Sequence, residues 1–433
     1  MTGNGGGEGH IWEGAWRIVG RLRAAGFAAY VVGGAVRDRI LGLPVEEADI
    51  ATAATPSEVL ALFPEAVPTG AAYGTVTVPW EGKAYEVTTF RREVYPTADR
   101  HPVVAFGTSL GEDLARRDFT INAMALGPEG EIVDPFGGRE DLRRGVVRAV
   151  GDAAERFRED PLRMVRAVRF AARFAFVIEE KTWEALVALR LELVRVARER
   201  ILAEVDKLFR REGIGRGLAL FDAAGLLAVV RPKCRPVAEA LFPRLSPELP
   251  RAVLVWTWER FLADPPGYPE GFFRLPWPRR LRRAAAILDA DLAELSASPP
   301  LAGLPWPLVR AWAEGDEDRA TALFSLLSLF REAGAEDFLV PAPRDGVGED
   351  SLPIVLPGRW ADVRTRLASL PVPTYRDLPL DVGDFLARHG FRPGPWVRKL
   401  REALYRSVNA GLFPPDPAAL EAEALRLAAR LER

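Results

Sequence analysis

Cysteine, histidine and lysine are scarce in this 433-residue sequence, and each scarcity excludes a class of site. With Cys234 as the sole cysteine, the chain can form no intramolecular disulfide and offers no cysteine-based zinc cluster. None of the three histidines, His10, His101 and His389, is followed by aspartate, which excludes a histidine–aspartate metal-hydrolase site. Only five of the 58 basic residues are lysine, so the positive charge is almost all arginine. The arginine fork suits phosphates and bases, although a GC-rich coding sequence explains the same bias.

Long apolar runs and a sizeable net charge are also lacking. No stretch approaches the length of a membrane span, so we expect no membrane partner. The opening MTGNGGGEGH has neither the basic start nor the apolar run of a signal peptide, and we expect a disordered leader and a cytoplasmic protein. Acidic and basic residues nearly cancel, at 60 and 58, so a nucleic-acid partner would have to be held by a local basic surface.

The sequence changes character near Gly151. Before it, strands such as AAYVVGG (Ala28–Gly34) alternate with short helices, and Glu81-Gly82 joins two alternating runs as a hairpin signal. After it, the pattern is helical almost to the end. We predict an α/β head, a small mixed sheet with helices, followed by an all-helical remainder. The expected parts are a leader, a head, a neck, a body, and a linker with a helical tail, over residues 1–10, 11–150, 151–212, 213–340 and 341–433.

A glycine pair ends the first predicted strand. Gly33 and Gly34 stand between that strand and a short helix, where glycines most often only make a tight turn. The alternative is an anion cradle, in which open backbone amides face a phosphate and Arg37 adds a forked donor.

Three carboxylates follow this turn. Glu47 and Asp49 are two residues apart, so on a strand both side chains leave the same face and could hold a divalent cation. Glu86, on a neighbouring predicted strand, is either a third carboxylate or an ordinary surface glutamate. A phosphate cradle beside a carboxylate pair is typical of metal-dependent nucleotidyl transfer.

An arginine-rich helix follows the head. Pro161 suits a first helical turn with Asp160 as its cap, and the helix carries Val165, Val168 and other apolar residues on one face. The opposite face has almost no acid among its residues and predicts an anionic partner; it holds Arg163, Arg166, Arg169 and Arg173.

Asp160 and Arg163 are one turn apart and could act as a pair. A carboxylate acceptor beside a guanidinium donor matches an edge that cytosine and adenine share, an exocyclic amino group next to a ring nitrogen. Uracil and guanine present a carbonyl where the carboxylate stands. The pair could therefore select C and A without a template.

Earlier in the chain, Arg116, Arg117 and Asp118 either begin a solvated helix or contact a triphosphate or ribose.

Together these motifs resemble the class II tRNA nucleotidyltransferases, or CCA-adding enzymes, and their sister bacterial poly(A) polymerases. The resemblance covers Ala28 to Glu212, and LPLDVGDFLARHGFRPGPWVRKLREAL resembles the family's C-terminal helices. The matching stretches, in order, are VVGGAVRD, ADIAT, GTVTV, EVTTFR, RHP, EDLARRDFTINAMA, DPFGG, ERFREDPLRMVRAVRFAARF and RERI.

The resemblance implies a nucleotidyltransferase-type head, a helical tail that binds tRNA, a Mg²⁺ cofactor and a role for each matching residue. The expected metal ligands are Glu47 and Asp49, with Glu86 as a further catalytic carboxylate. The residues expected to bind the nucleotide are Gly33, Gly34, Arg37, Arg117, Asp160, Arg163, Arg166 and Arg169. The segment Arg91–Pro102, with Arg100, corresponds to the flexible loop that lets such enzymes change from C to A.

One position departs from the family pattern, which has aspartate where this chain has Glu47. Glutamate is one methylene longer, whereas Mg²⁺ demands near-octahedral ligands at about 2.0–2.1 Å. A misplacement of about 1 Å can cost on the order of a hundredfold in rate. Because the other site residues are all present, we expect a working site with a longer arm.

The sequence therefore predicts addition of C, C and A to the 3′ end of tRNA, with CTP and ATP as substrates and pyrophosphate as product. The alternatives are a poly(A) or A-adding polymerase of the same family, and a non-catalytic RNA-binding protein if Glu47 disables the metal site. The glycine- and arginine-rich signature of the poly(A) polymerases is missing after the metal strand, where PTGAAYGTVTV stands instead. The long helical region disfavours a small-molecule nucleotidyltransferase. No oligomeric state is predicted.

Overall fold

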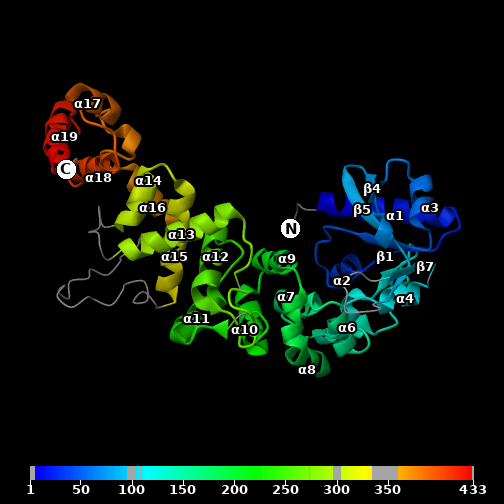
Figure 1. Ribbon diagram of the computed structural model, residues 1–433. Coiled ribbons are helices and arrows are strands. Elements are labelled where there is room, and N and C mark those ends of the chain that lie inside the picture. The colour runs from blue at the N-terminus through cyan, green and yellow to red at the C-terminus, as the bar shows by residue number, and fades with distance from the viewer. Residues whose placement is uncertain are drawn as a thin grey trace. The chain divides into compact units, whose positions relative to one another are not determined.

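The computed structural model describes residues 5–94, 103–107, 109–227, 229–272, 274–295, 304–333 and 359–431 (Figure 1). The chain forms two compact units, one made of Met1–Val229 with Asp264–Leu275 and the other of Val230–Ala263 with Pro276–Arg433. The finer division into leader, head, neck, body and tail stays a prediction. Arg100 and the predicted linker at 341–358 lie outside the described residues.

A seven-stranded mixed sheet is the centre of the first unit. Its strands are β1 (Ala29–Val32), β2 (Asp49–Thr52), β3 (Val67–Gly70), β4 (Thr75–Trp80), β5 (Lys83–Thr89), β8 (Ala125–Leu126) and β9 (Ile132–Val133). They are ordered β3-β4-β5-β2-β1-β8-β9. β2 is parallel to β5 and antiparallel to β1, so the strands that carry the predicted carboxylates are neighbours. Two short pairs lie outside this sheet: β6 (Arg91–Val94) with β7 (Val103–Phe106), and β10 (Val146–Val147) with β11 (Val177–Ile178).

The predicted hairpin is confirmed at β4 and β5. Trp80 pairs with Lys83 across the turn, and both turn residues have positive φ, 47° at Glu81 and 75° at Gly82. Two consecutive left-handed residues make the tight turn whose twist matches that of the paired strands.

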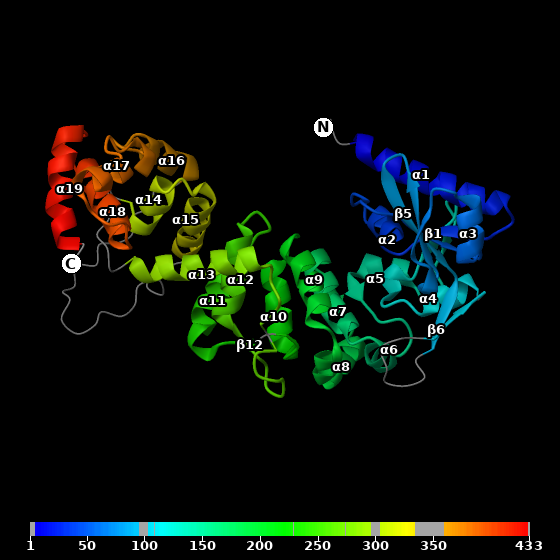
Figure 2. The same cartoon turned by 45° about the horizontal axis from the view of Figure 1, so that its top comes forward.

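Helices complete the first unit. They are α1 (Gly5–Ala24), α2 (Gly34–Ile40), α3 (Pro56–Leu62), α4 (Leu110–Ala115), α5 (Gly138–Arg144), α6 (Ala153–Glu159), α7 (Leu162–Phe174), α8 (Glu180–Leu189), α9 (Arg198–Phe209) and α10 (Ile214–Ala224). α1 and α3 pack beside each other against the sheet (Figure 2). α7 packs against both α9 and α10. Leu114 of α4 joins a core cluster with Val32, Ala51 and Ala125 of three adjacent strands.

The expected disordered leader is corrected in part. α1 begins at Gly5, so it includes six of the ten residues that were expected to be disordered. Ile11, Ala15, Ile18 and other apolar residues bury one face of this helix. Once such a packed segment has nucleated a helix, each further residue adds one hydrogen bond at low cost, so the helix extends into a polar, glycine-rich stretch.

The second unit is helical. Its helices are α11 (Arg235–Leu241), α12 (Arg251–Phe261), α13 (Arg279–Glu294), α14 (Trp306–Ala313), α15 (Glu317–Glu332), α16 (Trp360–Ala368), α17 (Val382–His389), α18 (Trp396–Asn409) and α19 (Pro417–Leu431). The two-residue strands β12 (Val229–Val230) and β13 (Leu262–Ala263) stand where the chain passes from one unit to the other. An α/β head followed by a helical remainder is thus confirmed. Over the described stretches, no helix is both long enough and apolar enough to cross a lipid bilayer.

Candidate active site

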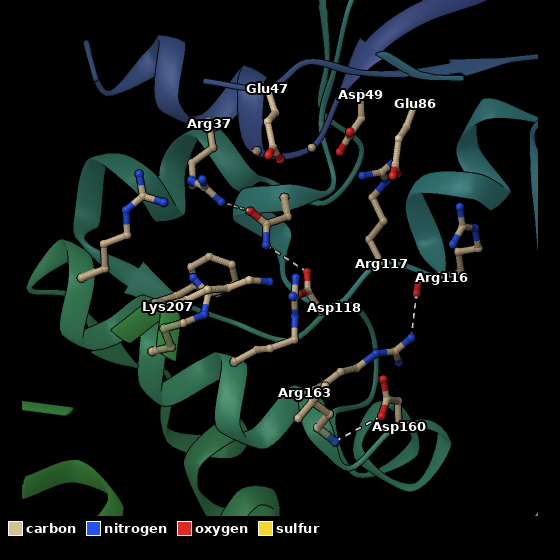
Figure 3. Close-up of a pocket in the computed structure, with 18 of the residues that line it drawn as sticks. Arg37, Glu47, Asp49, Glu86, Arg116, Arg117, Asp118, Asp160, Arg163 and Lys207 are labelled. Atoms are coloured by element: carbon tan, nitrogen blue, oxygen red, sulfur yellow. Dashed lines mark hydrogen bonds and ion pairs between the residues drawn. The ribbon is translucent and has the colours of Figure 1, made fainter. Parts of the chain in front are cut away.

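A cavity of about 850 Å³ opens in the first unit, beside the sheet and α7 (Figure 3). Every predicted site residue within the described parts of the chain lines it. These are Gly33, Gly34, Arg37, Glu47, Asp49, Glu86, Arg117, Asp160, Arg163, Arg166 and Arg169. The fold therefore brings together groups that are as much as 136 residues apart in the sequence, from Gly33 to Arg169.

The glycine turn between β1 and α2 sits close to an arginine. Gly33 has φ 73° and ψ −130°, a conformation that side chains rarely adopt, and α2 begins at Gly34. A Cβ built on Gly33 would lie 2.7 Å from Nη1 of Arg117. Glycine is thus required both by the backbone and by the guanidinium beside it.

The three carboxylates come from two adjacent strands. Asp49 is the first residue of β2, and Glu47 lies two residues before the strand begins. The expectation that both stand on the strand is therefore wrong for Glu47, yet both side chains face the cavity (Figure 3). Ile50 of β2 pairs with Val87 of the parallel strand β5. The residues that precede these two, Asp49 and Glu86, therefore lie side by side as well.

The environment of Asp49 favours a bound cation. Burial raises the pKa of Asp49 to about 6; Arg117 opposes this rise, while the negative charges of Glu86 and Glu47 add to it. Within the described residues, no group of three or more His, Cys, Asp and Glu side chains could hold a metal ion alone. This composition fits a site in which one or two carboxylates share the cation with substrate phosphates, as is usual for Mg²⁺.

Arg37 is anchored on two sides. Its Nε donates to Asp38 at 2.7 Å and its Nη1 to the amide oxygen of Asn122 at 2.5 Å, and its side chain is buried. The guanidinium also lies 4.9 Å from the ring centroid of Phe174. These contacts fix the orientation of the guanidinium at the wall of the cavity.

The predicted arginine face of α7 is paired with acids from other segments of the chain. The expectation of almost no compensating acid is therefore wrong, because the partners lie far away in the sequence or in the preceding helix. The ion pairs are Arg163 with Glu159 (2.7 Å), Arg166 with Asp118 (2.7 Å), Arg169 with Glu204 (2.6 Å) and Arg173 with Asp38 (3.3 Å).

These pairs keep the buried groups charged. Burial alone would raise the pKa of Asp118, but Arg166, Asn122 and Arg163 hold it at about 2. Burial lowers the pKa of Arg169 to about 10, which still leaves the guanidinium charged at neutral pH. The wall of the cavity is therefore a preformed array of oriented charges rather than a set of mobile arginines.

Asp160 and Arg163 lie at one end of the cavity (Figure 3). Asp160 precedes α7, and its Oδ1 accepts the N–H of Leu162 at 3.2 Å. The expectation that Asp160 caps this helix is wrong, because Pro161 stands at the N-cap position of α7 and Asp160 is the C-cap of α6. Its Oδ2 accepts from Arg200 at 2.9 Å. Arg163 donates to Glu159, to the carbonyl of Arg156 and to the carbonyl of Arg116.

Sequence reasoning missed several residues of this wall. Asn122, Arg200 and Lys207 line the cavity, and Glu204 stands behind it, where it accepts from Lys207 at 3.1 Å as well as from Arg169. Asn122 lies within the matched stretch EDLARRDFTINAMA, and Arg200 within RERI, so the resemblance offered a signal for these two. No periodicity or spacing pointed to Glu204 or Lys207.

Two family models match the chain. Residues 29–148 match the poly A polymerase head domain, and residues 175–236 match the probable RNA and SrmB-binding site of polymerase A. The sheet, its carboxylates and the arginine-lined cavity are thus those of a nucleotidyltransferase of the polymerase type.

Relatives that span nearly the whole chain define the family more closely. The CCA-adding enzyme of Geobacillus stearothermophilus is 38% identical over 91% of this chain and 92% of its own length. That of Latilactobacillus sakei is 37% identical over 93% and 95%. The crystal structure of the Bacillus stearothermophilus CCA-adding enzyme in complex with CTP aligns with a TM-score of 0.72 at 33% identity over 98% of both chains. The chain belongs to the family of CCA-adding enzymes, as its motifs predicted.

Proposed function

We propose that this protein adds C, C and A to the 3′ end of tRNA, with CTP and ATP as substrates and pyrophosphate as product. One observation carries the proposal: a single cavity joins a carboxylate cluster to a wall of oriented arginines, in a chain that aligns over 98% of its length with a CTP-bound CCA-adding enzyme. A poly(A) polymerase and a non-catalytic RNA-binding protein are less well supported, because the full-length relatives described above are CCA-adding enzymes.

Glu47 and Asp49 would hold a divalent cation, which we take to be Mg²⁺. Asp49 stands with Glu86 beside it, and the negative charges of Glu86 and Glu47 both act on it; a cation there would neutralise that charge. When bound, the cation lowers the pKa of the attacking 3′-hydroxyl and neutralises charge on the leaving phosphates. Glu86 would be the third carboxylate of the reacting centre.

Arg37 and Arg117 would bind the triphosphate together with the glycine turn. Nε of Arg117 is buried and has no hydrogen-bond partner within the described residues. A buried guanidinium N–H without an acceptor is costly, so an anionic oxygen from a ligand would satisfy it. Gly33 leaves room for Arg117 to reach the cavity. Arg166 and Arg169 would hold the nucleotide from the α7 side.

Asp160 and Arg163 would select the base. The protein contacts of Arg163 use both N–H groups of Nη1 and one of Nη2, so Nε–H and the second Nη2–H have no partner among the described residues. Each oxygen of Asp160 accepts one hydrogen bond and has a second acceptor site. The pair thus offers a donor and an acceptor to the edge that cytosine and adenine share.

The proposal is tested by incubating the full-length protein and Mg²⁺ with tRNA that lacks its 3′ CCA. CTP and ATP are supplied separately and together, and the products are resolved at single-nucleotide length. Growth by C, C and A that then stops supports the proposal. Long adenosine tails would favour the poly(A) polymerase, and tRNA binding with no incorporation at high Mg²⁺ or Mn²⁺ would favour the non-catalytic protein.

The change from C to A would depend on the segment Arg91–Pro102, of which residues 95–102, with Arg100, lie outside the described residues. The cytoplasmic location expected from the sequence likewise remains a prediction.

A further inference from the structure

Four arginines form a cluster at the start of α13, in the second unit, outside the cavity and outside both family matches. We define the arginine cluster as Arg279, Arg280, Arg282 and Arg283. All four are exposed. Within the described residues, none of their guanidinium groups makes an ion pair or a hydrogen bond.

The arginine cluster does not help α13 to fold. The positive end of the helix dipole lies at this terminus, so cations there are unfavourable, and the first turn holds no acid to offset them. Like charges three and four residues apart repel as well, as at Arg279, Arg282 and Arg283. The acids of α13, Asp289, Asp291 and Glu294, stand in its second half, which is the reverse of the stabilising order.

Some exposed arginines elsewhere in this protein have an acidic partner. Arg143 pairs with Glu140, and Arg210 with Asp206, each within one helical turn. A cluster that destabilises its own helix, and that has no acidic partner in the part of the chain that the structure describes, points to a role outside folding.

The surface at the arginine cluster is hollowed. A groove of about 530 Å³ is lined by Arg279, Arg280 and Arg283 together with Ala284 and Ile287. Forked guanidinium groups bind phosphate oxygens at two points, and neighbours on a helix surface are about 5–6 Å apart at Cβ.

We propose that the arginine cluster binds the sugar–phosphate backbone of tRNA, remote in sequence from the reacting centre. The inference rests on the proposed function, which makes tRNA the substrate. Phosphate contacts carry no sequence information, which suits an enzyme that must accept every tRNA. Because the whole chain is nearly neutral, with 58 basic and 60 acidic residues, tRNA affinity depends on such local concentrations of charge.

The test compares two full-length variants that lose the same charge. The first, R279Q/R280Q/R282Q/R283Q, removes the arginine cluster. The matched control removes four exposed arginines of the first unit that do not line the cavity, as R17Q/R139Q/R143Q/R144Q. Binding of tRNA lacking its 3′ CCA is measured by fluorescence anisotropy at several KCl concentrations.

The cluster variant should bind tRNA at least ~10-fold more weakly than wild type at 0.1 M KCl. The slope of log Kd plotted against log KCl concentration should also fall by about 2–3 for this variant. The control should change neither quantity by more than about twofold. Removing the repulsion should leave the melting temperature of the cluster variant unchanged or raised, which excludes unfolding as the cause of weak binding.

Other outcomes overturn the inference. Equal tRNA affinity and salt slope for the two variants would remove the arginine cluster from tRNA binding. Cluster-dependent binding to phosphatidylserine vesicles or to poly-glutamate, with tRNA binding intact, would assign it to a membrane or to an acidic protein. Failure of the proposed function is read separately, as absence of nucleotide incorporation by the wild-type protein, because the binding curves do not depend on catalysis.

Discussion

Glu204 of α9 and Arg169 of α7 form an ion pair of 2.6 Å in which 5% and 9% of their side-chain surfaces are exposed. Glu204 also accepts from Arg166 and Lys207, at 3.5 and 3.1 Å. One buried carboxylate thus orients three cations of the cavity wall. A buried charge that loses its partner is far more costly than an exposed one.

Replacing Glu204 with glutamine should therefore destabilise the protein. Without the carboxylate, Arg169 is left buried without its counter-charge, and we expect the free energy of unfolding to fall by about 3 kcal/mol in urea titrations at pH 7. The exposed pair of Arg210 with Asp206 provides the control, since D206N should cost less than about 1 kcal/mol. Equal losses in the two variants would contradict the role given to Glu204.

Replacing Arg163 with alanine should weaken base selection. The variant loses a charged donor to the base, and such a hydrogen bond contributes about 1.5–3 kcal/mol. We expect kcat/KM for CTP and ATP to fall roughly 10- to 100-fold relative to UTP and GTP, measured with single nucleotides on tRNA lacking its 3′ end. Arg158→Ala is the control, because Arg158 is an exposed arginine in the last turn of α6. Unchanged selection in the Arg163 variant would remove this residue from base reading.

Binding of a divalent cation should depend on pH through Asp49. Only the ionised carboxylate binds a cation, and burial, with the negative charges of Glu86 and Glu47, raises the pKa of Asp49 from 3.8 to about 6. Below that value protons compete with the cation, so the apparent Kd for Mn²⁺ should rise about tenfold per pH unit and level off above about pH 7. The apparent Kd for Mn²⁺ is measured by titration calorimetry between pH 5 and 7.5. A pH-independent Kd over this range would contradict the prediction.

The raised pKa of Asp49 also determines how the stability of the metal-free protein depends on pH. The folded protein holds the proton of Asp49 more tightly than the unfolded chain does. This group therefore favours the folded state below about pH 4, and that contribution is lost as the pH rises through about 6.

Local signals in the sequence predicted much of the head and of the cavity. The turn at Glu81-Gly82, the helix that begins at Pro56 after Thr55, and the strand that carries Asp49 each follow from the chemistry of a few adjacent residues. The capping box at Thr55 is one example, since Thr55 and Glu58 satisfy each other's backbone N–H.

Contacts between distant segments could not be predicted in this way. Glu204 accepts hydrogen bonds from Arg169 and Arg166, which lie 35 and 38 residues earlier in the chain. The positive charge on one face of α7 is thus neutralised by a carboxylate from another helix. Neither hydrophobic period nor motif spacing carries that information. The position of Glu47 before β2 has a similar origin, because strand ends are set by pairing with neighbouring strands rather than by the local pattern.

Replacing Glu47 with aspartate should raise the rate of nucleotide addition. The shorter arm matches the family pattern and removes a misplacement of about 1 Å, which can cost on the order of a hundredfold. We expect kcat to rise by up to that factor with Mg²⁺, while the Glu47→Gln control, which keeps the length and removes the charge, loses activity. If the wild-type protein adds no nucleotide, activity in the Glu47→Asp variant would show that the longer glutamate side chain disables an otherwise intact site. A fall in kcat for Glu47→Asp would show that this chain has adapted to glutamate.

Replacing Gly33 with alanine should impair nucleotide binding beyond its effect on folding. The φ of 73° is strained for alanine, and the new Cβ would lie 2.7 Å from Nη1 of Arg117, which must move away. Gly130→Ala is a matched control, because Gly130 has φ 85° and nothing within 4 Å of its would-be Cβ. Both variants should lose about 1–3 kcal/mol of stability from backbone strain. Only Gly33→Ala should raise the Kd for CTP, by roughly tenfold or more, since one charge-assisted contact is displaced. Equal CTP affinity in the two variants would mean that the glycine serves the turn alone and that Arg117 does not need its present position.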